Sequence, residues 1–172
     1  MSTSSAPPRV VVDTNLFVSG LILRRGNPFR LVEAFRAHRF HLILSDAQYT
    51  EIVGVFGRPK IVVKYRVLAK DIDALLTALA AAPRVIPRST LPVRVRDPKD
   101  EKILGTALAG DADYLVTGDE DLTTLAGDPH PGTLKIVTVV EFLAVLDELD
   151  EEAGEAGAGT ADPEDEGWFR CT

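Results

Sequence analysis

Short apolar runs and longer mixed segments alternate along the chain. The short runs are rich in Val, Ile and Leu and stop at polar residues, which is typical of strands buried within a sheet. We predict strands at residues 9–13, 40–45, 113–118 and 134–138, with a weaker candidate at 84–87. Strands that alternate with helical segments in this way indicate an α/β fold.

The longer segments show helical periodicity and recognisable start signals. Asp13 or Thr14 is a candidate N-cap for a first helical segment directly after the first strand. Pro28 suits the first turn of the next helix, and Ser45 with Gln48 has the pattern of a capping box. The further helices are expected at residues 28–39, 46–57, 58–66 and 70–82, from Pro98 onward, and at 138–150.

Length and composition indicate a single domain. The chain has 172 residues, 45% of them hydrophobic, which is enough to bury a core. We expect disorder in residues 1–8, the folded domain in 9–149 and a disordered acidic tail in 150–172. No apolar run approaches the roughly 18 residues of a membrane span, and the start lacks a signal-peptide core, so we expect a cytoplasmic protein. The single Cys171 excludes an internal disulfide.

The net charge of −7 conceals a segregation of charge along the chain. Residues 1–96 contain 15 Lys and Arg against 6 Asp and Glu, a net charge of +9, whereas residues 97–172 contain 4 against 20, a net charge of −16. A basic half of this size favours a polyanionic partner. The candidate RNA-binding residues are Arg24, Arg25 and Lys102, with a second basic group at Arg58, Lys60, Lys64 and Arg66.

Acidic residues recur where strands end and helices begin. Asp13 follows the first strand and Asp119 follows the strand at 113–118, so both belong to the carboxyl edge of the sheet. Asp100 precedes the buried stripe of the helix that starts at Pro98, on the same face, and Glu51 borders the apolar stripe of the helix at 46–57. Each acid by itself is also explained as a helix cap or a solvated group.

Four carboxylates at one sheet edge require a cation between them. At low dielectric they would repel one another strongly unless an ion compensated their charge. Oxygen ligands suit Mg²⁺ or Mn²⁺ rather than zinc. Such ions activate water and stabilise a leaving oxygen in phosphodiester hydrolysis. The pattern therefore points to a metal-dependent reaction on a phosphodiester.

Two motifs give the chain a family resemblance. "VVVDTNLFVSG" at residues 10–20 and "RDPKDEKILGTALAGDADYLVTGDEDL" at 96–122, followed by "IVTVVEFL" at 136–143, resemble the PIN-domain family, and within it the VapC-like toxin ribonucleases of bacterial toxin-antitoxin systems. The resemblance covers about residues 9–146. It implies a doubly wound, five-stranded parallel sheet flanked by helices and an endoribonuclease that depends on Mg²⁺ or Mn²⁺. It also implies an RNA substrate and a cognate antitoxin, with a homodimer as a further assembly to test.

The resemblance assigns roles to individual positions. The implied catalytic and metal-binding acids are Asp13, Glu51, Asp100 and Asp119, with Asp121 as an accessory metal ligand. The implied supporting residues, which orient carboxylates or waters, are Thr14, Asn15, Thr117 and Asp97. The acidic tail has no counterpart in the family pattern.

Two other interpretations stay open. A receiver-like signalling module also gathers acids at strand ends and binds Mg²⁺ without cleaving a substrate, and its candidate residues would be Asp46, Thr117 and Lys135. A PIN-like domain without catalysis, retained for binding RNA or protein, would have the same fold. Incubation with Mn²⁺ and structured RNA, against an EDTA control, distinguishes the three.

Overall fold

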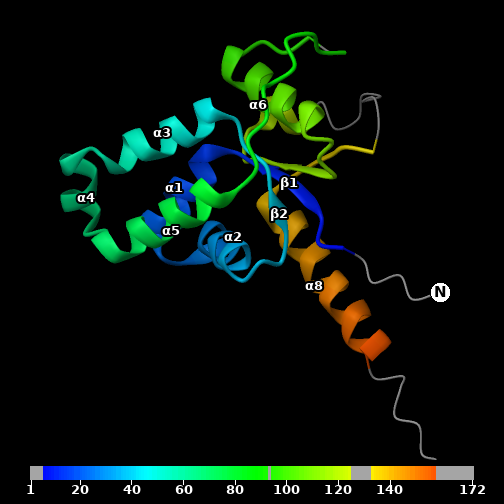
Figure 1. Ribbon diagram of the computed structural model, residues 1–172, viewed down its shortest axis with the longest axis horizontal. Helices are drawn as coiled ribbons and strands as arrows, with labels where there is room; N and C mark the ends of the chain where they lie inside the picture. The colour runs from blue at the N-terminus through cyan, green and yellow to red at the C-terminus, as the bar shows by residue number, and fades with distance from the viewer. Residues whose placement is uncertain (1–5, 93, 125–132, 158–172) are drawn as a thin grey trace, which may run out of the picture.

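A computed structural model describes residues 6–92, 94–124 and 133–157, and its centre is a parallel sheet (Figure 1). The strands are β1 (Arg9–Val12), β2 (His41–Leu42), β3 (Tyr114–Val116) and β4 (Lys135–Val137), in the order β2-β1-β3-β4. All the pairings are parallel, so the carboxyl ends of the four strands lie at one edge. The expected α/β fold is confirmed.

Helices occupy the connections between the strands. Between β1 and β3 the chain forms α1 (Thr14–Leu23), α2 (Gly26–Arg36), α3 (Asp46–Phe56), α4 (Pro59–Tyr65), α5 (Ala69–Ala81) and α6 (Pro98–Ala109). After β3 it forms α7 (Glu120–Thr124) and α8 (Val139–Gly157). None of the described helices is both long and apolar enough to cross a membrane.

The sheet is buried on both faces, which explains the consecutive valines of β1. Val10 and Val12 lie in a core with residues of α1, α2, α3, α5 and α8. Val11 points to the other face and lies in a second core with residues of α6 and α7. Because successive side chains of a strand alternate between faces, a strand covered on both sides must be apolar throughout.

The expected fifth strand is wrong. Residues 84–87 contribute one isolated parallel bridge, between Leu44 and Arg84, beside β2. The Leu44 N–H donates to the Pro83 carbonyl at 3.2 Å, and the Val85 N–H donates to the Leu44 carbonyl at 3.0 Å. Pro83 and Pro87 have no N–H to extend this ladder in either direction. Within the described residues the sheet therefore has four strands, and β2 is shorter than the run at 40–45 suggested.

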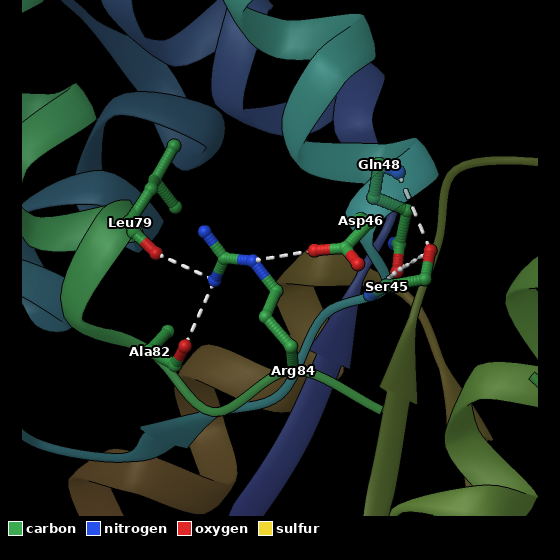
Figure 2. A network of polar contacts seen from close by, with 6 residues as sticks. All are labelled: Ser45, Asp46, Gln48, Leu79, Ala82 and Arg84. Atoms are coloured by element: carbon green, nitrogen blue, oxygen red, sulfur yellow. Dashed lines mark hydrogen bonds and ion pairs between the residues drawn. The ribbon is translucent and has the colours of Figure 1, made fainter. Parts of the chain in front are cut away.

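Arg84 joins the end of α5 to the start of α3 (Figure 2). Its guanidinium donates to the carbonyls of Leu79 and Ala82 at 2.9 and 2.8 Å, which lie at the C-terminal end of α5. Its Nε lies 3.5 Å from a carboxylate oxygen of Asp46, and the guanidinium stacks over the ring of Tyr49. Both of these residues belong to α3, so this arginine fixes the first turn of the helix that carries Glu51.

The last helix is longer than its sequence pattern predicted. It continues to Gly157, so the first part of the expected acidic tail is helical. The segment "EEAGEA" after Asp150 is rich in Glu and Ala, which are good helix formers. Directly before this extension, Arg39 forms ion pairs with Asp147 at 3.0 Å and Asp150 at 2.7 Å. At the start of the chain, where residues 1–8 were expected to be disordered, Pro8 is buried and its carbonyl accepts the His41 N–H at 2.8 Å. Residues 1–5 and 158–172, where other parts of the expected disorder fall, lie outside the described residues.

Candidate active site

The order of the strands reverses between β1 and β3. From β1 the chain moves to β2 on one side, and from β3 it moves to β4 on the other. In open α/β sheets, ligands bind outside the carboxyl ends of the strands at such a reversal. Asp13 directly follows β1, and Thr117 and Asp119 follow β3. The sequence therefore places its acidic motifs at the position where this topology forms a crevice.

Asp13 both caps α1 and joins the two strand ends. One carboxylate oxygen accepts the backbone N–H of Asn15 at 3.0 Å, so the capping interpretation is confirmed. The other carboxylate oxygen accepts the hydroxyl of Thr117 at 3.1 Å. The Asp13 N–H donates to the Val116 carbonyl at 2.9 Å, which continues the β1–β3 ladder up to the site. These three bonds orient the carboxylate.

The segment after β3 is held by a short relay of hydrogen bonds. Thr117 is fully buried, and its hydroxyl oxygen accepts the N–H of Asp119 at 3.1 Å. Asp119 in turn accepts the N–H of Asp121 at 2.9 Å. Asp119 lines the cavity described below, whereas Asp121 is exposed and does not line it. Thr117 is thus the residue that fixes the acids of both strand ends.

Asp100 is the most buried of the acids. Asp97 caps α6 by accepting the Lys99 N–H at 2.8 Å, which places Asp100 in the first turn with 8% of its surface exposed. Burial raises the pKa of the Asp100 carboxyl, and the negative charges of Asp119, Asp97 and Asp13 raise it further. This carboxyl therefore lies in a concentrated negative field that an ion would relieve.

Glu51 reaches the site from α3. Its carboxylate accepts the hydroxyl of Thr14 at 3.0 Å, in the first turn of α1. The helix itself is tied to β1, because the side-chain amide of Gln48 donates to the Val12 carbonyl at 3.2 Å. Gln48 also completes the capping box with Ser45 that the sequence predicted. The capping pattern thus serves to bring Glu51 alongside the end of β1.

These residues line one cavity of about 450 Å³. The predicted site residues that line it are Asp13, Thr14, Asn15, Glu51, Asp97, Asp100, Lys102 and Asp119. Within the described part of the chain, no Lys or Arg forms an ion pair with Asp13, Glu51, Asp100 or Asp119. Lys99 also lines the cavity and was not predicted, although its place directly before Asp100 could have indicated it. Ser45 and Gln48 were predicted only as a capping box, but they line the cavity as well.

Arg24 and Arg25 do not reach this cavity. Asp13 precedes the first residue of α1 and Arg24 follows its last, so the helix separates them by about 15 Å along its axis. Arg24 forms an ion pair with Asp71 at 3.1 Å, and Arg25 precedes α2. Of the three candidate RNA-binding residues Arg24, Arg25 and Lys102, the structure brings only Lys102 to the acids.

The donor set fits a hard divalent cation. As the side chains stand, no three His, Cys, Asp or Glu groups in the described chain form a ready-made cage for an ion. Mg²⁺ seldom needs one, because it is usually held by one or two carboxylates and completed by waters and substrate phosphates. Carboxylates lining one cavity, with a buried Asp100 among them, supply that arrangement. Sulfur and imidazole ligands do not line it, which argues against zinc.

Comparison with known proteins agrees with this geometry. The model of the PIN domain family matches residues 9–121, a range that contains all of the acids that line the cavity. The chain belongs to the PIN-domain family. A protein of Methanocaldococcus jannaschii, described as uncharacterized, is 31% identical over 140 residues, which cover 78% of this chain and 89% of that protein. PIN domains are generally nucleases, so the family indicates a hydrolase acting on nucleic acid.

The PIN membership and the structure together disfavour a receiver-like module. The carboxylate of Asp46, its candidate phosphoacceptor, is 91% exposed and pairs with Arg84 instead of lining the acidic cavity. Lys135 begins β4 at the amino edge of the sheet, where its ammonium lies over the ring of Tyr114. Thr117 is at the carboxyl edge. The three residues that this interpretation needs are therefore not assembled in one place.

Proposed function

We propose that the protein is an endoribonuclease that hydrolyses RNA phosphodiester bonds with Mg²⁺ or Mn²⁺. The observation that carries this proposal is the convergence of five carboxylates from four segments on one cavity, without a paired Lys or Arg in the described chain. Like charges gathered at this cost are typical of a site that binds a cation. The PIN domain match over the same residues supports a nuclease.

The residues divide into ligands and residues that position them. Asp13, Asp100 and Asp119 would hold the ion, and Glu51 would complete the site from α3. When bound, the ion supplies an activated water and charge stabilisation for the leaving oxygen. Thr117 orients Asp13 through its hydroxyl, and the hydroxyl of Thr14 orients Glu51. Hydrogen bonds of this kind fix the direction of a ligand before the ion arrives.

Basic and polar residues complete the substrate side of the cavity. Lys99 and Lys102 line it beside the acids, and their ammonium groups are suited to phosphate oxygens. Asn15 lines it as well and can donate to a substrate oxygen or a bound water. Asp121 remains a candidate for an accessory role, through water, because it lies outside the cavity lining. Asp97 acts through its cap on α6.

RNA cleavage in the presence and absence of metal tests the proposal. Single-stranded RNA incubated with Mn²⁺ or Mg²⁺ should be cut, and EDTA should abolish the cut. Asp13→Asn should remove cleavage because it takes away a charged ligand with little change of shape. Asp73→Asn, which changes an exposed acid of α5, is the matched control and should cut normally. If Asp13→Asn cleaves at the wild-type rate, Asp13 is not part of the mechanism.

A complete absence of cleavage would favour the second candidate, a PIN domain that binds RNA or protein without catalysis. The two are separated by binding measured in the same samples. An RNA that binds in EDTA but is not cut with either metal indicates a binding domain. An RNA that is both bound and cut indicates the nuclease.

We further propose that the enzyme is the toxin of a toxin-antitoxin pair acting in the cytoplasm. This rests on the resemblance of residues 10–20 and 96–122 to VapC-like toxins. Induced expression in a bacterial host should arrest growth, and Asp13→Asn should not. Co-expression of the adjacent reading frame should restore growth, and light scattering would show whether the toxin is a homodimer. Unimpaired growth with active enzyme would contradict the toxin role and leave the nuclease.

A further inference from the structure

A second cavity, of about 730 Å³, adjoins the acidic one. Both are lined by Ala47, Glu51 and Lys99, so the two lie side by side. The second cavity extends along α3, past Gly54, to Arg58 at the start of α4. Figure 1 shows α3 and α4 projecting to one side of the sheet, so this path leads away from the acids along an accessible helix. We call it the α3 groove.

Gly54 keeps the floor of the α3 groove open. It lies in the last turn of α3, and a helical glycine costs up to about 1 kcal/mol relative to alanine. Packing does not require the glycine, because a Cβ placed there would meet no atom within 4 Å. The absence of a side chain instead leaves room between Glu51 and Arg58. Glycine at such a position allows a ligand to approach the helix closely.

The acids and the cations that line the α3 groove differ in the contacts that they make with the rest of the protein. Of the groove's two acids, Asp46 pairs with Arg84, and Glu51, which accepts the Thr14 hydroxyl, also lines the acidic cavity where the ion would bind. Its two cations, Arg58 and Lys99, are exposed, and neither forms an ion pair with another described residue. The cations are therefore the groups available to a ligand, and they favour an anion.

We propose that the α3 groove is a binding subsite for the RNA strand on one side of the bond that is cut. The strand would pass over Gly54 and place phosphates near Lys99 and Arg58. From Glu51 to Gly57, the C-cap of α3, the helix rises by about 9 Å, and Arg58 follows directly, so the path is long enough for a few nucleotides. This inference rests on the proposed function. It adds the direction in which the bound RNA strand would run, from the acids toward α4.

Binding of RNA of two lengths in EDTA tests the subsite without requiring cleavage. Labelled single-stranded RNAs of about 4 and 12 nucleotides are titrated and followed by fluorescence anisotropy at several salt concentrations. Arg58→Gln should weaken binding of the longer RNA about 5- to 10-fold at low salt, and reduce the salt slope by about 0.7, the value for one phosphate contact on a single strand. The shorter RNA should lose less. DNA of the same lengths shows whether the subsite prefers ribose.

Arg36→Gln is the matched control for charge. It removes an exposed arginine of α2 that lines neither the acidic cavity nor the α3 groove. Wild-type affinity is expected for this variant at both lengths. Equal weakening by Arg36→Gln and Arg58→Gln would show a general charge effect and overturn the subsite.

A pair of glycine variants tests the path of the strand. Gly54→Gln places a side chain in the α3 groove, whereas Gly154→Gln makes the same change at an exposed position of α8 with equally free surroundings. Both should fold at least as stably as the wild type, because each replaces a helical glycine. Only Gly54→Gln should raise the KM for the longer RNA, by at least 5-fold.

The outcomes separate this inference from the proposed function. If the wild type cleaves RNA while Gly54→Gln and Arg58→Gln match their controls, the subsite is overturned and the nuclease remains. If the wild type binds RNA through the α3 groove but never cleaves it, the subsite stands and the nuclease is wrong. A wild type that binds no RNA in EDTA at low salt overturns the subsite.

Discussion

Thr117 offers the sharpest test of how the site is built. Its hydroxyl is fully buried, donates to the Asp13 carboxylate and accepts the Asp119 N–H, both at 3.1 Å. Thr117→Val preserves the shape and removes both hydrogen bonds. A hydrogen bond to a charged group contributes about 1.5–3 kcal/mol and a neutral one about 0.5–1.5 kcal/mol. The free energy of unfolding should therefore fall by about 2–4 kcal/mol.

The same substitution should impair catalysis. Without the hydroxyl, Asp13 keeps only the Asn15 N–H to orient its carboxylate, and loss of a residue that orients a metal ligand typically lowers activity 10- to 100-fold. Urea unfolding in EDTA, followed by circular dichroism, gives the stability, and cleavage with Mn²⁺ gives the rate.

Thr117→Ser separates the hydroxyl from the methyl group. It retains both hydrogen bonds and loses one buried methyl, so it should be destabilised by only about 1 kcal/mol and remain active. The reasoning fails if the valine variant unfolds within 0.5 kcal/mol of the wild type, or if serine is as damaging as valine.

Three other outcomes are expected. Burial and neighbouring acids raise the pKa of Asp100, so its charge costs folding stability as pH rises above the unfolded pKa. In EDTA at pH 7, Asp100→Asn should therefore raise the urea midpoint, with no difference below about pH 3; an equal midpoint at pH 7 would contradict this. The N–H and hydroxyl of Thr138 lower the pKa of Glu141, a contribution present above the unfolded pKa and lost as pH falls through the folded one. Glu141→Gln should therefore lower the Tm at pH 7 but not at about pH 2, and a pH-independent difference would refute that. Gly20→Ala should cost about 1–3 kcal/mol in urea unfolding, because its Cβ would lie 2.5 Å from the Pro28 carbonyl oxygen, and a rise in stability would show that the crossing of α1 and α2 relaxes.

Much of the site could be predicted because its residues lie where local rules place them. Asp13 ends an apolar strand, and Asp97 and Pro98 mark the start of a helix, so Asp100 falls in its first turn. The reversal of strand order then brings these positions to one edge. The position of Glu51 was harder to predict. It depends on the hydrogen bond from Gln48 to Val12 of β1, which joins residues far apart in the sequence.

The parts that could not be predicted depend on contacts between distant segments. Residues 84–87 have the composition of a strand, but Pro83 before the segment and Pro87 at its end restrict it to one bridge. Arg24 has the appearance of a free surface cation until α5 brings Asp71 against it. The α3 groove could not be predicted either. In the sequence Gly54 is only a residue with low helix propensity, and its place beside a cavity is known only from the structure.

The family match ends at residue 121, but the fold does not. β4 pairs with β3 along its length, and Phe142 and Leu146 of α8 belong to the core around β1. A chain cut after residue 124 would keep every acid that lines the candidate site and yet turn β3 into an open edge, with unpaired N–H and C=O groups and a bare apolar face. Open edges of this kind pair with other copies and aggregate. The shortest segment that contains all the acids of the candidate site is therefore shorter than the shortest segment expected to stay folded without aggregating.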